Sequence, residues 1–194
     1  KNYVSGWDDP RMPTISGMRR RGFTSNSIKD FCARIGITKK NSSIEMGVLE
    51  NTIREELNLS AKRVMGILDP LKIVITNYPE GEKEEILAAN NPNDKEIGQR
   101  NISISKNIYI DKNDFMESPE KKYFRLSPGK EVRLRHAFNI ICNKVIKSND
   151  GKIIELECSF DPVSRDMKKG NKVKGMIHWV DANNCIDATI NIYD

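Results

Sequence analysis

Arginine side chains on one predicted strand have the clearest capacity for binding chemistry in this sequence. The segment 131–135 reads Glu-Val-Arg-Leu-Arg. In a strand, alternate side chains share a face, so Arg133 and Arg135 are expected together on the exposed face. Val132 and Leu134 then face the core, and removing the Arg133 side chain is expected to leave stability nearly unchanged. Parallel guanidinium groups suit phosphate oxygens and base edges, although an ordinary surface strand has the same pattern.

A second candidate site lies a few residues upstream, where Tyr123 and Phe124 precede Arg125. Aromatic rings stack on unpaired bases, while arginine contacts phosphates and base edges. The combination is typical of a surface that binds single-stranded RNA.

A run of three arginines forms a third candidate cluster, Arg19, Arg20 and Arg21. It precedes a predicted helix, where its guanidinium groups could contact phosphate oxygens from several directions. A solvated basic turn with acidic neighbours is an equally good interpretation. The total charge does not decide between them, because 32 Lys and Arg against 27 Asp and Glu leave a net charge of only +5.

Residues for catalysis or metal binding are sparse. No phosphate-binding glycine loop, zinc-protease signature or nucleophile-elbow motif occurs. His136 and His178 are the only histidines, and His178 is interpreted as a structural residue at a strand end. Asp8 and Asp9 precede Pro10 and are expected to cap a turn rather than to transfer protons. We therefore predict neither a catalytic residue nor a metal site in this chain.

The composition indicates a folded chain from a reducing compartment. Its 194 residues, 38% hydrophobic and 30% charged, suffice for one domain or two small ones. The 4 cysteines lack a C-x-x-C pair, which favours free thiols over zinc or a disulfide framework. No apolar run reaches the roughly 20 residues that span a bilayer, and no signal-peptide core begins the chain. We expect a cytoplasmic protein without a membrane partner.

The first third of the chain has the pattern of helices. Apolar residues recur on one helical face over 28–35. Thr24 is the predicted N-cap of this helix and Gly36 its stop. A capping box predicts a second helix over 42–58, and a weaker pattern predicts a helical turn over 60–65.

The remainder has the pattern of a β structure. Alternation and β-branched residues predict strands at 71–75, 102–105, 108–110, 131–145, 153–160, 173–180 and 188–193. An Asp150-Gly151 turn predicts a hairpin, and the polar stretch 80–99 is interpreted as a solvated connection. The predicted fold class is α+β, with a small helical subdomain over 1–68 and an antiparallel β-barrel region over 69–194.

Longer segments resemble one enzyme family. The segment 6–22, which begins Gly-Trp-Asp-Asp-Pro-Arg, resembles the region after the ATP-binding signature loop of glutaminyl-tRNA synthetases. The segments 68–70, 129–135 and 173–180 resemble the same enzymes in the same order, so the resemblance covers essentially the whole chain. Eukaryotic-type glutamyl-tRNA synthetases share the Gly-Trp-Asp-Asp-Pro-Arg start, and the segment 12–17 favours the glutamine family.

The resemblance implies a class I aminoacyl-tRNA synthetase with a Rossmann catalytic domain, a helical connector and two β-barrels that hold the anticodon. This chain would supply the connector over 1–68 and the anticodon-binding barrel region over 69–194, incomplete at its C-terminal end. The full-length enzyme would attach glutamine to its tRNA using ATP and Mg²⁺. No cofactor is expected in this chain, which would be inactive alone because both ATP-binding signatures lie upstream. The implied partners are glutamine tRNA, ATP and glutamine, and not DNA.

The resemblance also implies which side chains contact the anticodon loop. The corresponding positions are polar or basic and are Asn58, Arg63, Asn93, Arg125, Arg133 and Arg135. Arg133 and Arg135 would face the first anticodon base and its phosphate. Arg63 would face the middle base and Arg125 the third. Phe124 stands where a bacterial relative has lysine, so a phosphate salt bridge would be lost while the ring could stack on a base.

Two alternatives remain open from the sequence. One is the same region of a eukaryotic-type glutamyl-tRNA synthetase. The other is a non-catalytic tRNA- or protein-binding module in which the barrel is only a scaffold. ATP-binding signatures upstream of this segment would separate an enzyme from a module.

Overall fold

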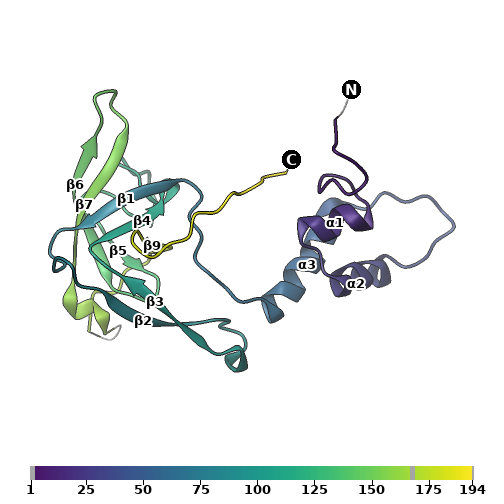
Figure 1. Cartoon of the computed structure of the whole chain (residues 1–194), viewed down its shortest axis with the longest axis horizontal. Helices are drawn as coiled ribbons and strands as arrows, with labels where there is room; N and C mark the ends of the chain where they lie inside the picture. Colours follow the sequence, from purple (N-terminus) through teal and green to yellow (C-terminus); the bar gives the residue numbers. More distant parts are fainter. Residues whose placement is uncertain (1–2, 167–168, 194) are drawn as a thin grey trace. The chain divides into compact units, whose positions relative to one another are not determined.

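The computed structural model describes residues 3–166 and 169–193, which form two compact units (Figure 1). The helical unit contains residues 1–62, 91–97 and 189–194, and the sheet unit contains residues 63–90 and 98–188. Three helices and a curled, mostly antiparallel sheet confirm the predicted α+β class.

Three helices form the helical unit: α1 (Ile15–Arg21), α2 (Ser25–Ile35) and α3 (Met46–Ser60). The ends of α2 confirm the sequence prediction. The Thr24 hydroxyl accepts a hydrogen bond from Ser27 N at 3.1 Å, and Gly36 ends the helix with a φ of 67°. Thr14 caps α1 in the same way, and Gly22 ends it in the left-handed region with a φ of 105°.

The start of α3 differs from the prediction. Its N-cap is Glu45, whose side chain makes no capping hydrogen bond, so the predicted capping box is wrong. The box serines, Ser42 and Ser43, lie in an irregular segment ahead of the cap position. The predicted helical turn over 60–65 is also wrong, because the backbone becomes extended at Ala61 with a ψ of 138°.

The sheet unit contains a 7-stranded sheet with the order β8-β5-β6-β7-β1-β4-β9. Its strands are β1 (Pro70–Ile75), β4 (Asn107–Asp111), β5 (Glu131–Leu134), β6 (Asn139–Lys147), β7 (Ile153–Phe160), β8 (Met176–Ile177) and β9 (Val180–Asp181). The pairs β1–β7 and β5–β8 are parallel, and the other neighbours are antiparallel. A separate antiparallel ribbon consists of β2 (Glu84–Ala89) and β3 (Gln99–Ile104). Short 3₁₀ helices occupy Lys95–Ile97, Lys112–Asp114 and Pro162–Arg165.

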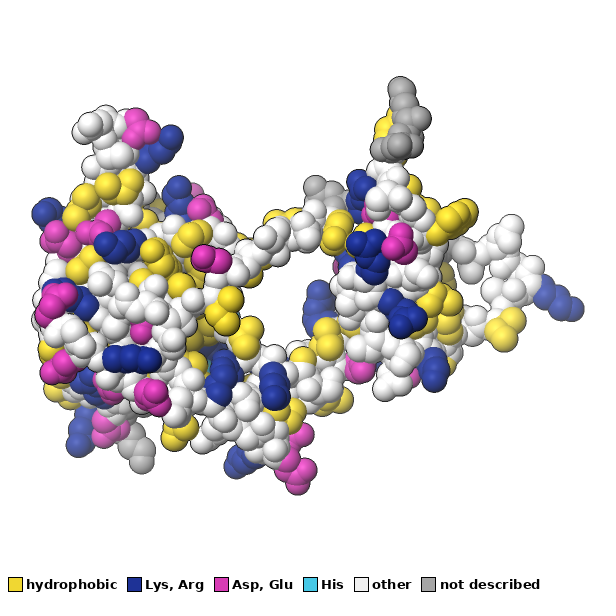
Figure 2. Space-filling model, viewed as in Figure 1, with side chains coloured by type: hydrophobic (Ala, Val, Ile, Leu, Met, Phe, Trp, Pro, Cys, Tyr) yellow, Lys and Arg dark blue, Asp and Glu magenta, His cyan; other side chains and the backbone are white. Residues whose placement is uncertain are grey.

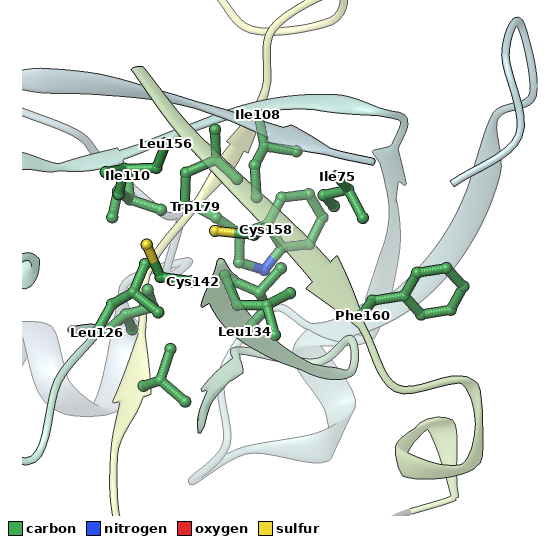
Figure 3. Packing of buried hydrophobic residues seen from close by; sticks show 14 of the residues in the cluster. Ile75, Ile108, Ile110, Leu126, Leu134, Cys142, Leu156, Cys158, Phe160 and Trp179 are labelled. Carbon is green, nitrogen blue, oxygen red and sulfur yellow. The ribbon is translucent and has the colours of Figure 1, made fainter. Parts of the chain in front are cut away.

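One buried apolar cluster holds the sheet unit together (Figure 3). Side chains from β1, β4, β5, β6 and β7 meet in it, and Ile75, Leu134 and Trp179 are at most 1% exposed. Burying a large apolar side chain contributes about 1.5–3 kcal/mol relative to leaving it in water. Cys142 and Cys158 are free thiols, as predicted, and lie opposite each other in the β6–β7 register.

Strand prediction succeeded where alternation was strong and the turn was local. The strand over 71–75 and the hairpin closed by Asp150 and Gly151 are confirmed. The predicted strand over 131–145 is instead interrupted by a tight turn. Leu134 N donates to Phe138 O at 2.9 Å, so the segment folds back as the hairpin of β5 and β6.

The polar stretch 80–99 is not only a connection, because it contains β2. Ala88 in β2 is fully buried, and Ile86 packs against the apolar cluster. Alanine gives little strand signal, and pairing with β3 stabilises the segment instead. Between 173 and 180 the structure has β8 and the first residue of β9, and the described residues 188–193 contain no strand.

Candidate nucleic-acid interface

β5 places Arg133 opposite two core residues, as the sequence predicts, but the strand ends at Leu134, so Arg135 lies in the turn that follows it. Val132 and Leu134 are fully buried, whereas Arg133 and Arg135 are half-buried. Backbone pairing with β6 on one side and β8 on the other holds the strand. The two arginines therefore start from a fixed backbone, but their side chains have different surroundings.

The Arg133 guanidinium is held by the protein itself. Its Nη1 donates to Asn139 Oδ1 at 3.1 Å and to Ser164 O at 2.9 Å, and its Nη2 donates to Ala137 O at 2.9 Å. Hydrogen bonds to a charged group contribute about 1.5–3 kcal/mol. The structure therefore corrects the expectation that Arg133 lies on the surface without a structural role, because its side chain ties the β5–β6 turn to the segment at Ser164.

Arg135 differs from Arg133 because only its backbone is held. Arg135 N donates to Ile177 O at 3.1 Å, and Arg135 O accepts from Trp179 Nε1 at 2.8 Å. Within residues 3–166 and 169–193, the guanidinium of Arg135 has no hydrogen bond or ion pair. A fixed backbone with an uncommitted guanidinium is suited to bind an external anion or base edge.

Arg125 is exposed and forms an ion pair with Asp114. Burial raises the pKa of the Asp114 carboxyl, and the Arg125 charge opposes that rise. Leu126 N donates to Asp114 O at 3.0 Å, so the backbone of the Arg125 loop is tied to the same residue. This contact orients the guanidinium while leaving half of the side chain in solvent.

Two histidines lie in the electrostatic field of Arg135. Burial lowers the pKa of His136 and of His178, and the charge of Arg135 lowers both further. Arg100 adds to this effect at His136, whereas Asp114 opposes it at His178. The lowered pKa values favour the neutral form of both imidazoles, which can accept a hydrogen bond. His136 follows Arg135 directly in the chain, whereas the pairing of β5 with β8 brings the segment of His178 near Arg135, and sequence reasoning missed this second approach.

Asn58 lies in the last turn of α3, and two other sequence-predicted residues, Arg63 and Asn93, follow the helix in the chain. In the helical unit, Asn93 Nδ2 donates to Asn58 O at 3.2 Å. The buried Asn91, which sequence reasoning missed, donates to the same oxygen at 3.2 Å and so satisfies the helix end. In the sheet unit, Arg63 N donates to Asn90 O at 2.7 Å. Contacts of these side chains with RNA remain predictions.

The arginine run on α1 is mostly committed to neighbouring carboxylates. Arg20 pairs with Asp8 at 2.9 Å, and Arg21 pairs with Glu50 at 3.5 Å. Arg19 is exposed and has no side-chain partner in the part of the chain that the structure describes. Exposed ion pairs contribute little, so these groups can exchange a carboxylate for a phosphate at small cost.

Cationic and anionic side chains are interspersed on the visible face of the sheet unit, without one continuous basic patch (Figure 2). Across the described ranges, no group of three or more His, Cys, Asp or Glu could hold a metal ion. The helices in those same ranges are too short or too polar to cross a membrane. The candidate interface is therefore defined by the positions of individual arginines, Arg125, Arg133 and Arg135.

The sheet unit places arginines beside a loop with aromatic rings, an arrangement that suits the binding of single-stranded RNA. Sequence comparison defines the class, since the chain belongs to the class I tRNA synthetases for glutamate and glutamine. Residues 61–161 match the anticodon-binding domain of this family, and residues 1–59 match its catalytic domain.

Three similar curated proteins are each named glutamine–tRNA ligase. Glutamine–tRNA ligase of Clostridium perfringens is 52% identical over 100% of this chain, and that of Bradyrhizobium diazoefficiens is 50% identical over 100%. The ligase of Nitrobacter hamburgensis is 49% identical over 98%. The chain covers 36%, 35% and 35% of these proteins, so it spans little more than a third of their length.

Proposed function

We propose that this chain is the anticodon-recognition portion of a glutamine–tRNA ligase, which in full length attaches glutamine to its tRNA using ATP. The observation that carries the proposal is the similarity to glutamine–tRNA ligases along the entire chain, 52% identical in the Clostridium perfringens relative. A glutamyl-tRNA synthetase is less well supported by these relatives. A non-catalytic module is less well supported because residues 1–59 match a catalytic domain.

Recognition proceeds by readout of single-stranded RNA. Anticodon bases unstack, and planar arginine forks hydrogen-bond to their edges and phosphates. Arg135 is the first candidate, because its guanidinium has no partner within the described residues. Arg125 is the second, because a phosphate can replace the exposed side of its ion pair with Asp114. Arg133 positions Arg135 by holding the β5–β6 turn, and its own contact with RNA is a further part of the proposal.

The remaining parts of the proposal concern the full-length protein. Its catalytic domain uses ATP and Mg²⁺ to activate the glutamine carboxyl group, and the anticodon contacts report the identity of the tRNA. Residues 1–68 serve as a connector between the catalytic domain and the anticodon-binding region at 69–194. The residues that line the tRNA are Arg19, Arg20, Arg21, Asn58, Arg63 and Asn93, and the protein acts in the cytoplasm.

Aminoacylation by the full-length protein tests the proposal. Arg135→Ala is expected to lower kcat/KM for glutamine tRNA about 5- to 150-fold, because a bidentate contact to a base contributes about 1–3 kcal/mol. Lys152→Ala, which removes one positive charge at the β6–β7 turn, serves as the matched control and is expected to act like wild type. Attachment of glutamate in place of glutamine, or unchanged kcat/KM for Arg135→Ala, would contradict the proposal.

A further inference from the structure

Two cysteines lie directly opposite each other in the middle of the sheet. Cys142 on β6 pairs with Cys158 on β7 in the antiparallel register. Cys142 O accepts from Gly129 N at 2.9 Å, and Cys158 O accepts from Thr76 N at 2.8 Å. Because these donors lie beyond the outer edges of the two strands, the cysteines form a non-hydrogen-bonded pair, whose Cα atoms are about 4.5 Å apart in regular sheets. A disulfide joins Cα atoms about 4.4–6.8 Å apart, so this pair is within its reach.

Both thiols lie inside the apolar cluster of the sheet unit (Figure 3). Cys142 is 1% exposed and Cys158 is fully buried. Side chains of opposed residues in a strand pair project from the same face, so the two sulfur atoms are neighbours. A hydrogen bond between the thiols lowers the pKa of Cys142 and, together with burial, raises the pKa of Cys158. Cys142 is therefore the better nucleophile, because the thiolate is the reactive form.

The ladder is irregular directly after this pair. The register passes from Cys142 and Cys158 to Lys144 and Glu157, so Asn143 is an extra residue in β6. Asn143 and Lys144 are exposed, and beyond Cys142 the described residues pair β6 with β7 alone. A bulge beside an open edge favours local opening of the strand. Such an opening gives a small oxidant access to Cys142.

We propose that Cys142 and Cys158 form a site of reversible oxidation, at which a hydroperoxide converts the two opposed thiols into a cross-strand disulfide. This inference does not depend on RNA binding, since it rests on the register of β6 and β7 and on the bulge beside Cys142. Its substrate class is a small peroxide, because a larger oxidant does not reach the interior of the sheet.

The oxidation proceeds in two steps. The Cys142 thiolate attacks one oxygen of hydrogen peroxide, the O–O bond breaks, and Cys142 becomes a sulfenic acid while hydroxide leaves. The hydroxide takes up the proton that the Cys142 thiol has released and becomes water. Cys158 then attacks the sulfenic sulfur, the S–S bond forms, and the sulfenic hydroxyl leaves with the Cys158 proton as a second water. Two thiols lose two electrons in total, and one peroxide gains them.

The disulfide would fasten β6 to β7 beside the point where the ladder is weakest. Opening of the segment 143–147 would then no longer separate the two strands at Cys142. A thiol reductant restores both thiols by attack on the S–S bond. In a reducing compartment the two thiols are the resting form, and the disulfide forms on exposure to peroxide.

Peptide mapping of the full chain after treatment with hydrogen peroxide under native conditions tests the site. After alkylation of the remaining thiols and digestion without reductant, mass spectrometry is expected to find one peptide pair joined through Cys142 and Cys158. Dithiothreitol is expected to separate the pair. Amide hydrogen exchange over 143–147 is expected to slow in the oxidised protein. The control variant with Cys32→Ala and Cys185→Ala lacks the exposed thiols and is expected to form the same link.

Single substitutions assign the roles of the two cysteines. In Cys158→Ala, peroxide is expected to leave Cys142 as a sulfenic acid, which dimedone traps. In Cys142→Ala, Cys158 is expected to remain a thiol, because it is fully buried and its pKa is raised. Circular dichroism shows whether each variant is folded, and the wild-type peptide map decides the matter if one is not.

Three results would count against this site. Oxidation of Cys32 and Cys185 while Cys142 and Cys158 stay thiols would overturn the proposal. A link that forms only in urea would also overturn it, because the native register would then not bring the sulfur atoms together. Amide exchange over 143–147 that is unchanged after the link has formed would overturn the role of the bulge as the route of access.

Discussion

The two units of this chain differ in how they use apolar and charged side chains. The sheet unit buries one continuous apolar cluster, in which Leu134 is fully buried, and it leaves the Arg135 guanidinium uncommitted among the described residues. The helical unit buries the apolar side chains of Phe23 and Leu49, and it pairs Arg20 with a carboxylate. Because its own apolar core stabilises the sheet unit, the Arg135 charge is not needed for an ion pair and is available to a ligand. The helical unit has little core of its own.

The largest expected effect tests whether the apolar cluster stabilises the sheet unit more than the apolar contacts of α3 stabilise the helical unit. Leu134→Ala is expected to lower the free energy of unfolding of the sheet unit by about 2–5 kcal/mol, because the substitution leaves a cavity in a packed interior. Leu57→Ala in α3 is the matched change at a side chain that is 38% exposed, and its cost is expected to be below about 1 kcal/mol. Urea denaturation followed by the fluorescence of the buried Trp179, with the substitution Trp7→Phe, measures the sheet unit, and the far-ultraviolet circular dichroism of the helices in the same titration measures the helical unit. Similar costs for the two substitutions would remove the distinction between the units.

The second prediction sharpens the contrast between Arg133 in β5 and Arg135 in the turn that follows. Arg133→Ala is expected to destabilise the sheet unit by about 1.5–3 kcal/mol, because three oxygen acceptors lose a charged donor. Arg135→Ala is expected to change stability by less than about 0.5 kcal/mol, as surface substitutions usually do. Thermal melts of both variants, beside RNA titrations, separate folding from binding. An unfolding cost at Arg135 equal to that at Arg133 would count against the assignment of roles.

The third prediction concerns the charges of the helical unit. A double-mutant cycle on Arg20 and Asp8 is expected to give a coupling energy below about 1 kcal/mol, because both side chains are exposed. The coupling is expected to vanish at 1 M salt, where the screening length is about 3 Å. A larger coupling that survives high salt would show that this pair supports the fold. Melting temperatures of the four proteins in the cycle provide the measurement.

The smallest expected effect is a pH dependence of the stability and the RNA affinity of the sheet unit. His136 and His178 are the only histidines of the chain, and folding lowers the pKa of each below its ordinary value of 6.5. As pH falls from about 7 to 5.5, the unfolded chain therefore binds protons that the folded chain does not, and the stability of the sheet unit decreases. Bound phosphate favours the charged imidazole, so RNA affinity is expected to rise over the same range.

The variant with both His136→Gln and His178→Gln is the control for this effect. Its stability and its RNA affinity are expected to vary less with pH than those of wild type. Denaturation and RNA titration at several pH values check both signs. Parallel pH profiles for wild type and variant would show that other groups cause the dependence.

The parts of the fold that sequence could predict are those whose causes are local. Thr24 and Gly36 delimit α2 because a cap and a left-handed residue act within one turn. The alternation in β5 predicts which side chains are buried, because its period is fixed by strand geometry. β2 was missed because its stability comes from pairing with β3 rather than from its own alanine-rich sequence.

For the candidate site, the sequence predicted the alternation of buried and accessible side chains in β5, but not which polar partners each arginine has. The sequence predicted Arg133 and Arg135 on one face. It did not indicate that Arg133 donates a hydrogen bond to Ser164 O, which lies 31 residues away in the chain. Lys174 stands far from Phe124 in the chain, yet its ammonium lies 5.2 Å from the centroid of the Phe124 ring. A single sequence contains no signal for such distant pairs, so it cannot distinguish a structural arginine from one available to a ligand.

The parallel pairing of β1 with β7 also constrains how this protein forms during translation. The Asn77 side chain donates to Phe160 O at 2.9 Å across 83 residues of chain, and Phe160 N returns a hydrogen bond to Asn77 Oδ1. At a ribosomal rate of about 5–20 residues per second, β7 is synthesised several seconds after β1. During this time one edge of β1 has no partner strand. Contacts of such long range slow folding, so β1 must remain unaggregated with an open hydrogen-bonding edge until β7 has left the ribosome.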